Sequence, residues 1–329
     1  MDSSTASVVV STTNVTAFDL IFSATFLAAV IRMTTPILLA SLGGLITGRA
    51  GIMNIALEGI MLWAALIGVL VTGYTKNILS DPLRLLLALL AGIGVGVFLA
   101  IMMAIFSIKL KANITLAGIA INMFSSGATV FLLYFLTGDK GSSASVPSIK
   151  FPSWDIPLIK DIPFIGQVIS GQNILTYVAF LCVIIVYLLM FKTPTGLRLR
   201  AVGENPDAAE SVGIKVNNIK YLALILSGVF AGLGGLFMSI GYTNSFVRDM
   251  VAGRGFIAMS AQNLGRSHPI GAMIASFIFG AADALANNLQ ALTIPQQLLA
   301  TLPYVTTLLA LFVYSIARAR KINKMKAQR

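Results

Sequence analysis

Long apolar stretches separated by short polar loops run through almost the whole chain. They cover residues 17–47, 53–73, 84–108, 114–138, 173–191, 219–240, 253–290 and 297–317. About 20 apolar residues are enough for an α-helix to cross a bilayer, so most stretches predict one spanning helix each. The first stretch contains Arg32 and Pro36, and it is long for one crossing but short for two. It predicts either one tilted or broken helix or a pair of crossings.

The stretch at residues 253–290 is interrupted by the sequence Arg266-Ser267-His268-Pro269. Its first arm is short for a full crossing and predicts a half-length helix. Counting that arm, we expect an all-α polytopic membrane protein with about nine transmembrane helices, or about ten if residues 17–47 cross twice.

The composition supports a membrane protein. Hydrophobic residues make up 57% of the chain and charged residues 11%, whereas soluble domains carry about 25% charge. Helices suit this setting because they bond every backbone N–H and C=O internally. We therefore expect one transmembrane domain at residues 17–317, preceded by a polar segment at residues 1–16 and followed by a basic tail at residues 318–329.

The distribution of positive charge predicts the topology. When Lys and Arg are assigned to alternate sides of the predicted spans, fifteen fall on one side and seven on the other, with Arg32 inside a span. The richer side is expected to be cytoplasmic. This places the loop at residues 192–220 and the basic tail inside the cell, and the loop at residues 139–172 outside. The net charge of +11 is thus a topology signal, and no nucleic-acid partner is expected.

The cytoplasmic loop contains the pattern of a short capped helix. Asn205 can cap a helix, Pro206 fits its first turn and Gly213 supplies a stop. Asp207 and Glu210 are near the positive end of the helix dipole. Such a helix could be an inert linker, or it could pack into a groove on another protein. The external loop is rich in proline and contains Trp154, a candidate interfacial anchor; it is either a rigid surface feature or a docking surface.

Several polar side chains lie within the predicted spans. Asn54 and Glu58 are four residues apart and share one helix face, and Asn122, Gln262 and Asn263 lie in other apolar stretches. Polar groups at membrane depth suggest a substrate path. The alternative is that each amide ties helices together and that Glu58 makes a buried structural hydrogen bond.

A short internal repeat adds to this picture. AGIMNIALEGIML begins at Ala50 and AGRGFIAMSAQNLG begins at Ala252. Transporters place substrate at the interface of such repeats, so Asn54, Glu58, Gln262 and Asn263 are predicted to face one central cavity.

The sequence has no pattern for catalysis or for a cofactor. It contains no phosphate-binding loop of the Gly-x-x-x-x-Gly-Lys-Ser/Thr type. The single histidine, His268, and the single cysteine, Cys182, cannot form a catalytic set or a metal site. We therefore expect a non-enzymatic subunit without metal, and any ATP hydrolysis on a separate subunit.

Three segments resemble one known family. Asp207-Ala208-Ala209-x-x-x-Gly213 resembles the Glu-Ala-Ala-x-x-x-Gly coupling-helix signature of ABC importer permeases, although Asp replaces the usual Glu. GIMNIALEGI from Gly51 and GRGFIAMSAQNLGRSHPIG from Gly253 resemble the branched-chain amino acid and sugar permease superfamily. Their sequences are similar to the corresponding segments of the nucleoside (purine nucleoside or guanosine) permeases of that superfamily.

The resemblance implies a multi-pass protein of the bacterial plasma membrane with four kinds of partner. These are an ABC ATPase subunit, a second related permease, an external solute-binding protein (a lipoprotein or a periplasmic protein) and a small solute. The ATPase would contact Asn205, Pro206, Asp207, Ala208, Ala209, Glu210 and Gly213. Riboflavin, a sugar or a branched-chain amino acid are alternative solutes. An ion-coupled secondary transporter and an uncoupled scaffold or channel are alternative functions.

Overall fold

The computed structural model describes residues 23–157, residues 165–289 and six isolated positions between 301 and 312. Seven of the described helical segments are long and apolar enough to cross a membrane. They are α2 (Ala24–Arg49), α3 (Leu57–Tyr74), α4 (Asp81–Ala104) with the π-helix η1 (Ile105–Lys109), α5 (Ile114–Thr137), α7 (Ile174–Lys192), α10 (Val216–Leu236) with the π-helix η2 (Phe237–Thr243), and α12 (Pro269–Leu289). The predicted all-α polytopic fold is confirmed.

Among the described residues, the helices favour the lower of the two predicted numbers of crossings. α2 is a single helix with Pro36 inside it, so the two-crossing interpretation of residues 17–47 is wrong. The predicted half-length helix is α11 (Arg254–Leu264), which has 11 residues. The predicted final span at residues 297–317, the polar segment at 1–16 and the basic tail at 318–329 lie largely or wholly outside the described residues.

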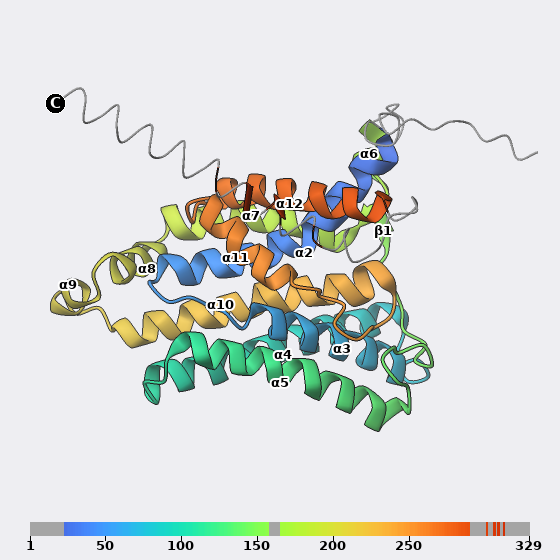
Figure 1. Cartoon of the computed structure of the whole chain (residues 1–329), viewed down its shortest axis with the longest axis horizontal. Helices are drawn as coiled ribbons and strands as arrows, with labels where there is room; N and C mark the ends of the chain where they lie inside the picture. Colours follow the sequence, from blue (N-terminus) through green and yellow to red (C-terminus); the bar gives the residue numbers. More distant parts are fainter. Residues whose placement is uncertain are drawn as a thin grey trace, which may run out of the picture.

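The bundle has a buried centre and an exposed flank. In the most apolar part of each helix, 78% of α2, 72% of α3 and 83% of α10 is buried, against 28% of α4 and 22% of α5. The largest fully buried side chains include Leu38, Leu42, Ile60 and Phe237. α4 and α5 therefore form a flank that faces lipid or another subunit, and Figure 1 shows them along one edge of the bundle.

Small residues allow α4 to pack closely on α10. A Cβ atom at Gly228 would lie 2.5 Å from the backbone oxygen of Gly96. Since a real side chain cannot approach so closely, the two backbones touch only because both residues are glycine.

Replacing Gly228 with Val should destabilise the bundle by roughly 1–3 kcal/mol or more, because the added atoms must force the helices apart. Gly94 is the matched control, since nothing lies within 4 Å of a Cβ atom there. Thermal unfolding of the purified protein should show a lower midpoint for Gly228→Val and an almost unchanged one for Gly94→Val. Equal midpoints would contradict the close contact.

The two ends of the bundle carry different connections. α8 (Pro194–Glu204) and α9 (Pro206–Ser211) lie at one end, and α6 (Ile165–Ile169) and β1 (Ser153–Trp154) lie at the other (Figure 1). β1 pairs with β2 (Gln172–Asn173) in antiparallel fashion. The loop predicted to be external is tied to the bundle, because the Phe151 N–H donates to the Ile240 carbonyl at 2.8 Å. The Trp154 ring lies edge-on to Tyr177.

Candidate functional site

Two helices begin inside the bundle, and their starts meet. The segments that lead into α3 and α11 contain Gly51 and Gly253, with φ angles of 71° and 81°, a conformation that glycine adopts without steric cost. From their starts α3 and α11 run toward opposite ends of the molecule (Figure 1). The two similar sequence segments thus form an inverted pair, an arrangement found around the substrate sites of transporters.

Glu58 joins the two helix starts. Its carboxylate accepts hydrogen bonds from the backbone N–H of Gly253 at 2.8 Å and from that of Gly255 at 2.7 Å. These N–H groups have no partner within a helix N-terminus, and the helix dipole favours a negative charge there. Glu58, in the first turn of α3, therefore caps α11. The sequence left two roles open for Glu58, a place in a substrate path or a structural hydrogen bond. These two bonds are of the structural kind.

A buried ion pair lies beside this cap. The Arg254 guanidinium is 2.6 Å from the Asp283 carboxylate, and the two side chains are 13% and 12% exposed. Arg254 is the first residue of α11, and Asp283 belongs to α12. The ion pair therefore fixes the start of α11 to α12.

Two asparagines hold the segment that enters α3. Asn54 is 2% exposed; it donates to Ser227 Oγ on α10 at 2.8 Å and accepts from the Ala56 N–H at 3.0 Å. Asn122 on α5 accepts from the Gly59 N–H and donates to the Ile55 carbonyl, both at 2.8 Å. Both amides satisfy backbone groups around the break, and Asn122 stays partly exposed.

The two polar residues at the end of α11 have different environments. Gln262 is 3% exposed, and its Oε1 atom has no hydrogen-bond partner among the described residues. Asn263 is exposed. Within the described residues, Asn54 and Gln262 thus lie in helix contacts, whereas Glu58, Asn122 and Asn263 are at least partly open. The structure does not bring all the predicted path residues into one closed cavity of this chain.

Exposed or partly exposed polar side chains also occur on α5, on the segment before α11 and on α11 itself, and we term this set the polar face. Its members are Asn122, Ser126, Asp249, Ser260 and Asn263, all exposed or partly exposed. Ser126 Oγ donates to the Asp249 carboxylate at 2.8 Å, which links α5 to the segment before α11. Polar groups at membrane depth rarely face lipid, so this face suits a second subunit or a water-filled path.

Sequence reasoning missed three members of the polar face: Ser126, Asp249 and Ser260. One signal was available, because Ser126 follows Asn122 by four residues and therefore shares its helix face. The contact between residues 126 and 249 crosses 123 positions, and local spacing cannot predict such a pair.

The short capped helix is confirmed as α9. The Asn205 side chain accepts from the Ala208 N–H at 3.0 Å, Pro206 begins the helix, and Gly213 follows with φ of 83°. Asp207, Ala208 and Glu210 are exposed, whereas Ala209 is only 4% exposed. Val212 and Leu197 add apolar surface, at 76% and 61% exposed.

The surface helices touch the break before α3. A Cβ atom at Gly51 would lie 3.2 Å from the Gly203 Cα atom of α8. α8 is joined to α9 through Asn205, which ends the first helix and caps the second. α9 is thus linked through α8 to the segment before α3, and Glu58 links α3 to the start of α11.

Three curated relatives are similar over most of the chain. The guanosine ABC transporter permease protein NupQ of Bacillus subtilis is 35% identical over 86% of this chain and 89% of its own length. The nucleoside ABC transporter permease protein NupC of Lactococcus lactis is 33% identical over 90% and 95%. A Haloferax volcanii protein named as a glucose ABC transporter permease, TsgC13, is 31% identical over 92% and 94%.

A solved structure and a family model agree with these relatives. The chain matches a structure described as an inward-facing metal-chelate type ABC transporter with a TM-score of 0.51, at 17% identity, over 88% of this chain and 85% of the other. This likeness supports the fold. The model of the family described as branched-chain amino acid transport system, permease component, matches residues 26–313. The chain, a multi-pass membrane protein, therefore belongs to this family of transport permeases.

Proposed function

We propose that the chain is a permease subunit of an ABC importer and that its polar face lines the path of a nucleoside-like solute. The observation that carries this proposal is the exposure of polar groups on α5, on α11 and on the segment before α11, next to the junction of α3 and α11. The names of two relatives that are 35% and 33% identical support the solute class.

The chemistry of the polar face suits a neutral, hydroxyl-rich solute. Asn122 and Asn263 offer amide donors and acceptors, and Ser126 and Ser260 offer hydroxyl groups; both kinds can bond to ribose hydroxyls and base edges. A second, related permease would cover the face and complete the path. Tight binding is not needed at this site, because an external solute-binding protein would supply affinity and the path must release its solute.

The energy for transport would come from ATP hydrolysis on a separate subunit. The exposed surface of α9, with Asp207, Ala208 and Glu210, would dock on an ABC ATPase subunit. α8 would then pass the motion of the ATPase to residues 50–56 through the Gly203–Gly51 contact. Because this segment leads into α3, and Glu58 of α3 caps α11, the starts of the two helices would move together. This movement would change access to the polar face.

Uptake by cells tests this function. A strain that lacks this chain should lose uptake of labelled guanosine, and a plasmid copy should restore it. Excess unlabelled nucleosides should compete, whereas glucose, riboflavin and leucine should not. Competition by one of those solutes alone would identify a different substrate.

A second comparison separates the driving forces. Depletion of ATP should stop uptake, and a protonophore applied while ATP is maintained should leave it intact. The opposite pattern would favour the ion-coupled secondary transporter.

The neighbouring residues Gln262 and Asn263 separate transport from helix packing. Because Asn263 is exposed on the polar face, Asn263→Ala should lower uptake per assembled complex several-fold while the amount of complex stays normal. Gln262 is buried, so Gln262→Ala should mainly change the amount of complex. Uptake normalised to complex isolated from membranes provides the measurement. Normal uptake per complex in Asn263→Ala, Asn122→Ala and Ser126→Ala together would contradict the proposed path.

A further inference from the structure

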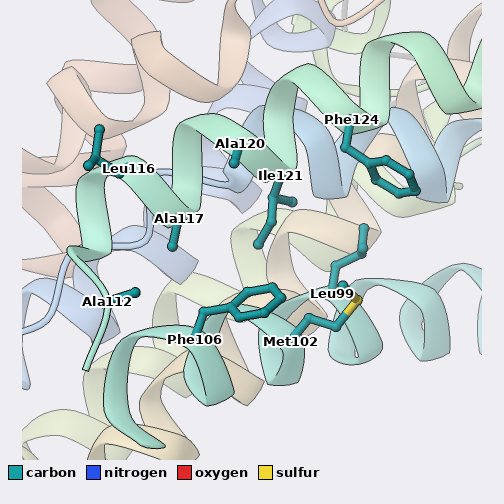
Figure 2. A pocket seen from close by; sticks show the side chains of 9 residues that line it. All are labelled: Leu99, Met102, Phe106, Ala112, Leu116, Ala117, Ala120, Ile121 and Phe124. Carbon is teal, nitrogen blue, oxygen red and sulfur yellow. The ribbon is translucent and has the colours of Figure 1, made fainter. Parts of the chain in front are cut away.

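An apolar groove separates α4 from α5 in the half of the bundle near their connecting loop. It has a volume of about 480 Å³, and Figure 2 shows side chains from both helices pointing into it. Its lining consists only of Ala, Leu, Ile, Met and Phe side chains, among them Leu99, Met102, Phe106, Ala112, Ala120 and Phe124. None of these carries a polar side chain, so the groove suits a hydrocarbon chain and offers nothing to a hydroxyl-rich solute.

A second pocket, lined in part by polar side chains and by one lysine, lies next to this groove. Its volume is about 520 Å³, and its lining includes Ala112, which also lines the groove, together with Thr115, Asn217 and Lys220. Because Ala112 lines both cavities, the partly polar pocket lies beside the apolar groove, and we call it the mouth of the groove. Such a pairing matches the division of a phospholipid into headgroup and acyl chain.

One lysine lines this pocket, and two more lie within three residues of Ala112 in the chain. Lys109 ends η1, Lys111 precedes Ala112 in the chain, and Lys220 lines the pocket itself. No carboxylate belongs to the lining of either cavity among the described residues, and the ion pairs found there involve other residues. A phosphate group would therefore meet uncompensated positive charge, an arrangement that binds anionic headgroups between transmembrane helices.

We propose that this groove and its mouth form a binding site for an anionic phospholipid. One acyl chain lies between α4 and α5, and the headgroup phosphate lies among Lys109, Lys111 and Lys220. The site is in the leaflet at the end of the bundle that carries α8 and α9.

The position of the groove favours lipid over a second subunit. The groove opens between α4 and α5, whereas Asn122 and Ser126 project from a different face of α5. Along α4 the exposed side chains are apolar and include Leu86, Leu90 and Phe98, at 50%, 58% and 60% exposed. An apolar flank of this kind can contact lipid chains without removing any polar group from water. Lipid therefore has direct access to the groove.

Native mass spectrometry of the assembled transporter tests the proposal. The complex is stripped of lipid in detergent and then mixed with equal amounts of phosphatidylglycerol and phosphatidylcholine that carry the same acyl chains. The wild-type complex should retain phosphatidylglycerol in preference. Lys109→Ser and Lys111→Ser should each reduce that preference roughly fivefold, while Lys215→Ser, an exposed lysine outside both cavities, should leave it unchanged.

A second variant tests the groove. Ala120 is exposed and lines the groove, so Ala120→Trp can fill it without displacing packed side chains. This variant should lose the retained lipid, and Leu90→Trp on the open flank of α4 should keep it. Equal retention of the two lipids by the wild type, or unchanged retention by Ala120→Trp, would overturn the proposal.

Chemical labelling of a cysteine in the groove distinguishes lipid from a protein segment as its occupant. In a Cys182→Ser background, Ala120→Cys should react with a membrane-permeant maleimide in the lipid-stripped complex and become protected when phosphatidylglycerol is added. Protection in the stripped complex, with no effect of lipid, would assign the groove to a protein segment instead.

Discussion

Replacing Asp207 with Arg together with Ala208 with Trp is expected to abolish ATP-driven uptake while the chain still inserts and assembles its helices. Both side chains are exposed on α9, so the bundle does not depend on them. A reversed charge and an added ring at the centre of a docking surface cost about 2 kcal/mol or more of binding, which weakens docking about thirtyfold.

The choice of Ala208 follows from the structure. Ala209, which the family pattern suggests equally, is 4% exposed, and its carbonyl accepts a hydrogen bond from the Ile214 N–H at 3.0 Å. A large residue there would distort α9 itself and could not report on docking alone.

The measurement has two parts. Uptake is normalised to the chain present in the membrane, and co-purification of the ATPase subunit is scored from the same cells. Lys192→Glu, an exposed charge reversal at the end of α7, is the matched control and should keep both activities. Wild-type uptake by the α9 double variant would refute the coupling role.

Much of the fold could be predicted from the sequence because its determinants are local. Runs of apolar residues predict the spans directly, and the Asn205-Pro206 pair predicts the start of α9 through its cap. The break at residues 266–269 predicts the half-length helix, since a short apolar arm cannot cross a bilayer. Each of these inferences needs only neighbouring residues.

The candidate site was harder to predict because its contacts join distant segments. The bond from Glu58 to Gly253 spans 195 positions, and no spacing rule indicates that a carboxylate in one apolar segment caps a helix in another. Residue type alone singles out Asn54, Glu58 and Gln262 as polar groups within apolar segments. Whether each one faces a path or a helix contact depends on the packing, and the packing places Asn54 and Gln262 inside and Asn263 outside.

The Arg254–Asp283 pair is expected to have the largest effect on stability. Arg254 Nε and Nη2 both lie near Asp283 Oδ2, at 2.9 and 2.6 Å, and both side chains are largely buried between α11 and α12. Removal of one partner leaves the other charge unpaired at membrane depth, which costs about 3–5 kcal/mol in buried pairs. Total stabilities are about 5–15 kcal/mol, so either single change should remove a large share.

A double-mutant cycle distinguishes the ion pair from simple loss of packing. Arg254→Met and Asp283→Leu should each lower the thermal midpoint and the yield of folded complex strongly. The double variant, which carries no charge and similar volume, should recover much of the loss, because an apolar pair can replace a buried ion pair at little cost. Arg248→Met is the matched control, because its contact with Asp249 is exposed and contributes little. If the two single losses simply add in the double variant, then Arg254 and Asp283 act independently, and the start of α11 must be held by the Glu58 cap alone.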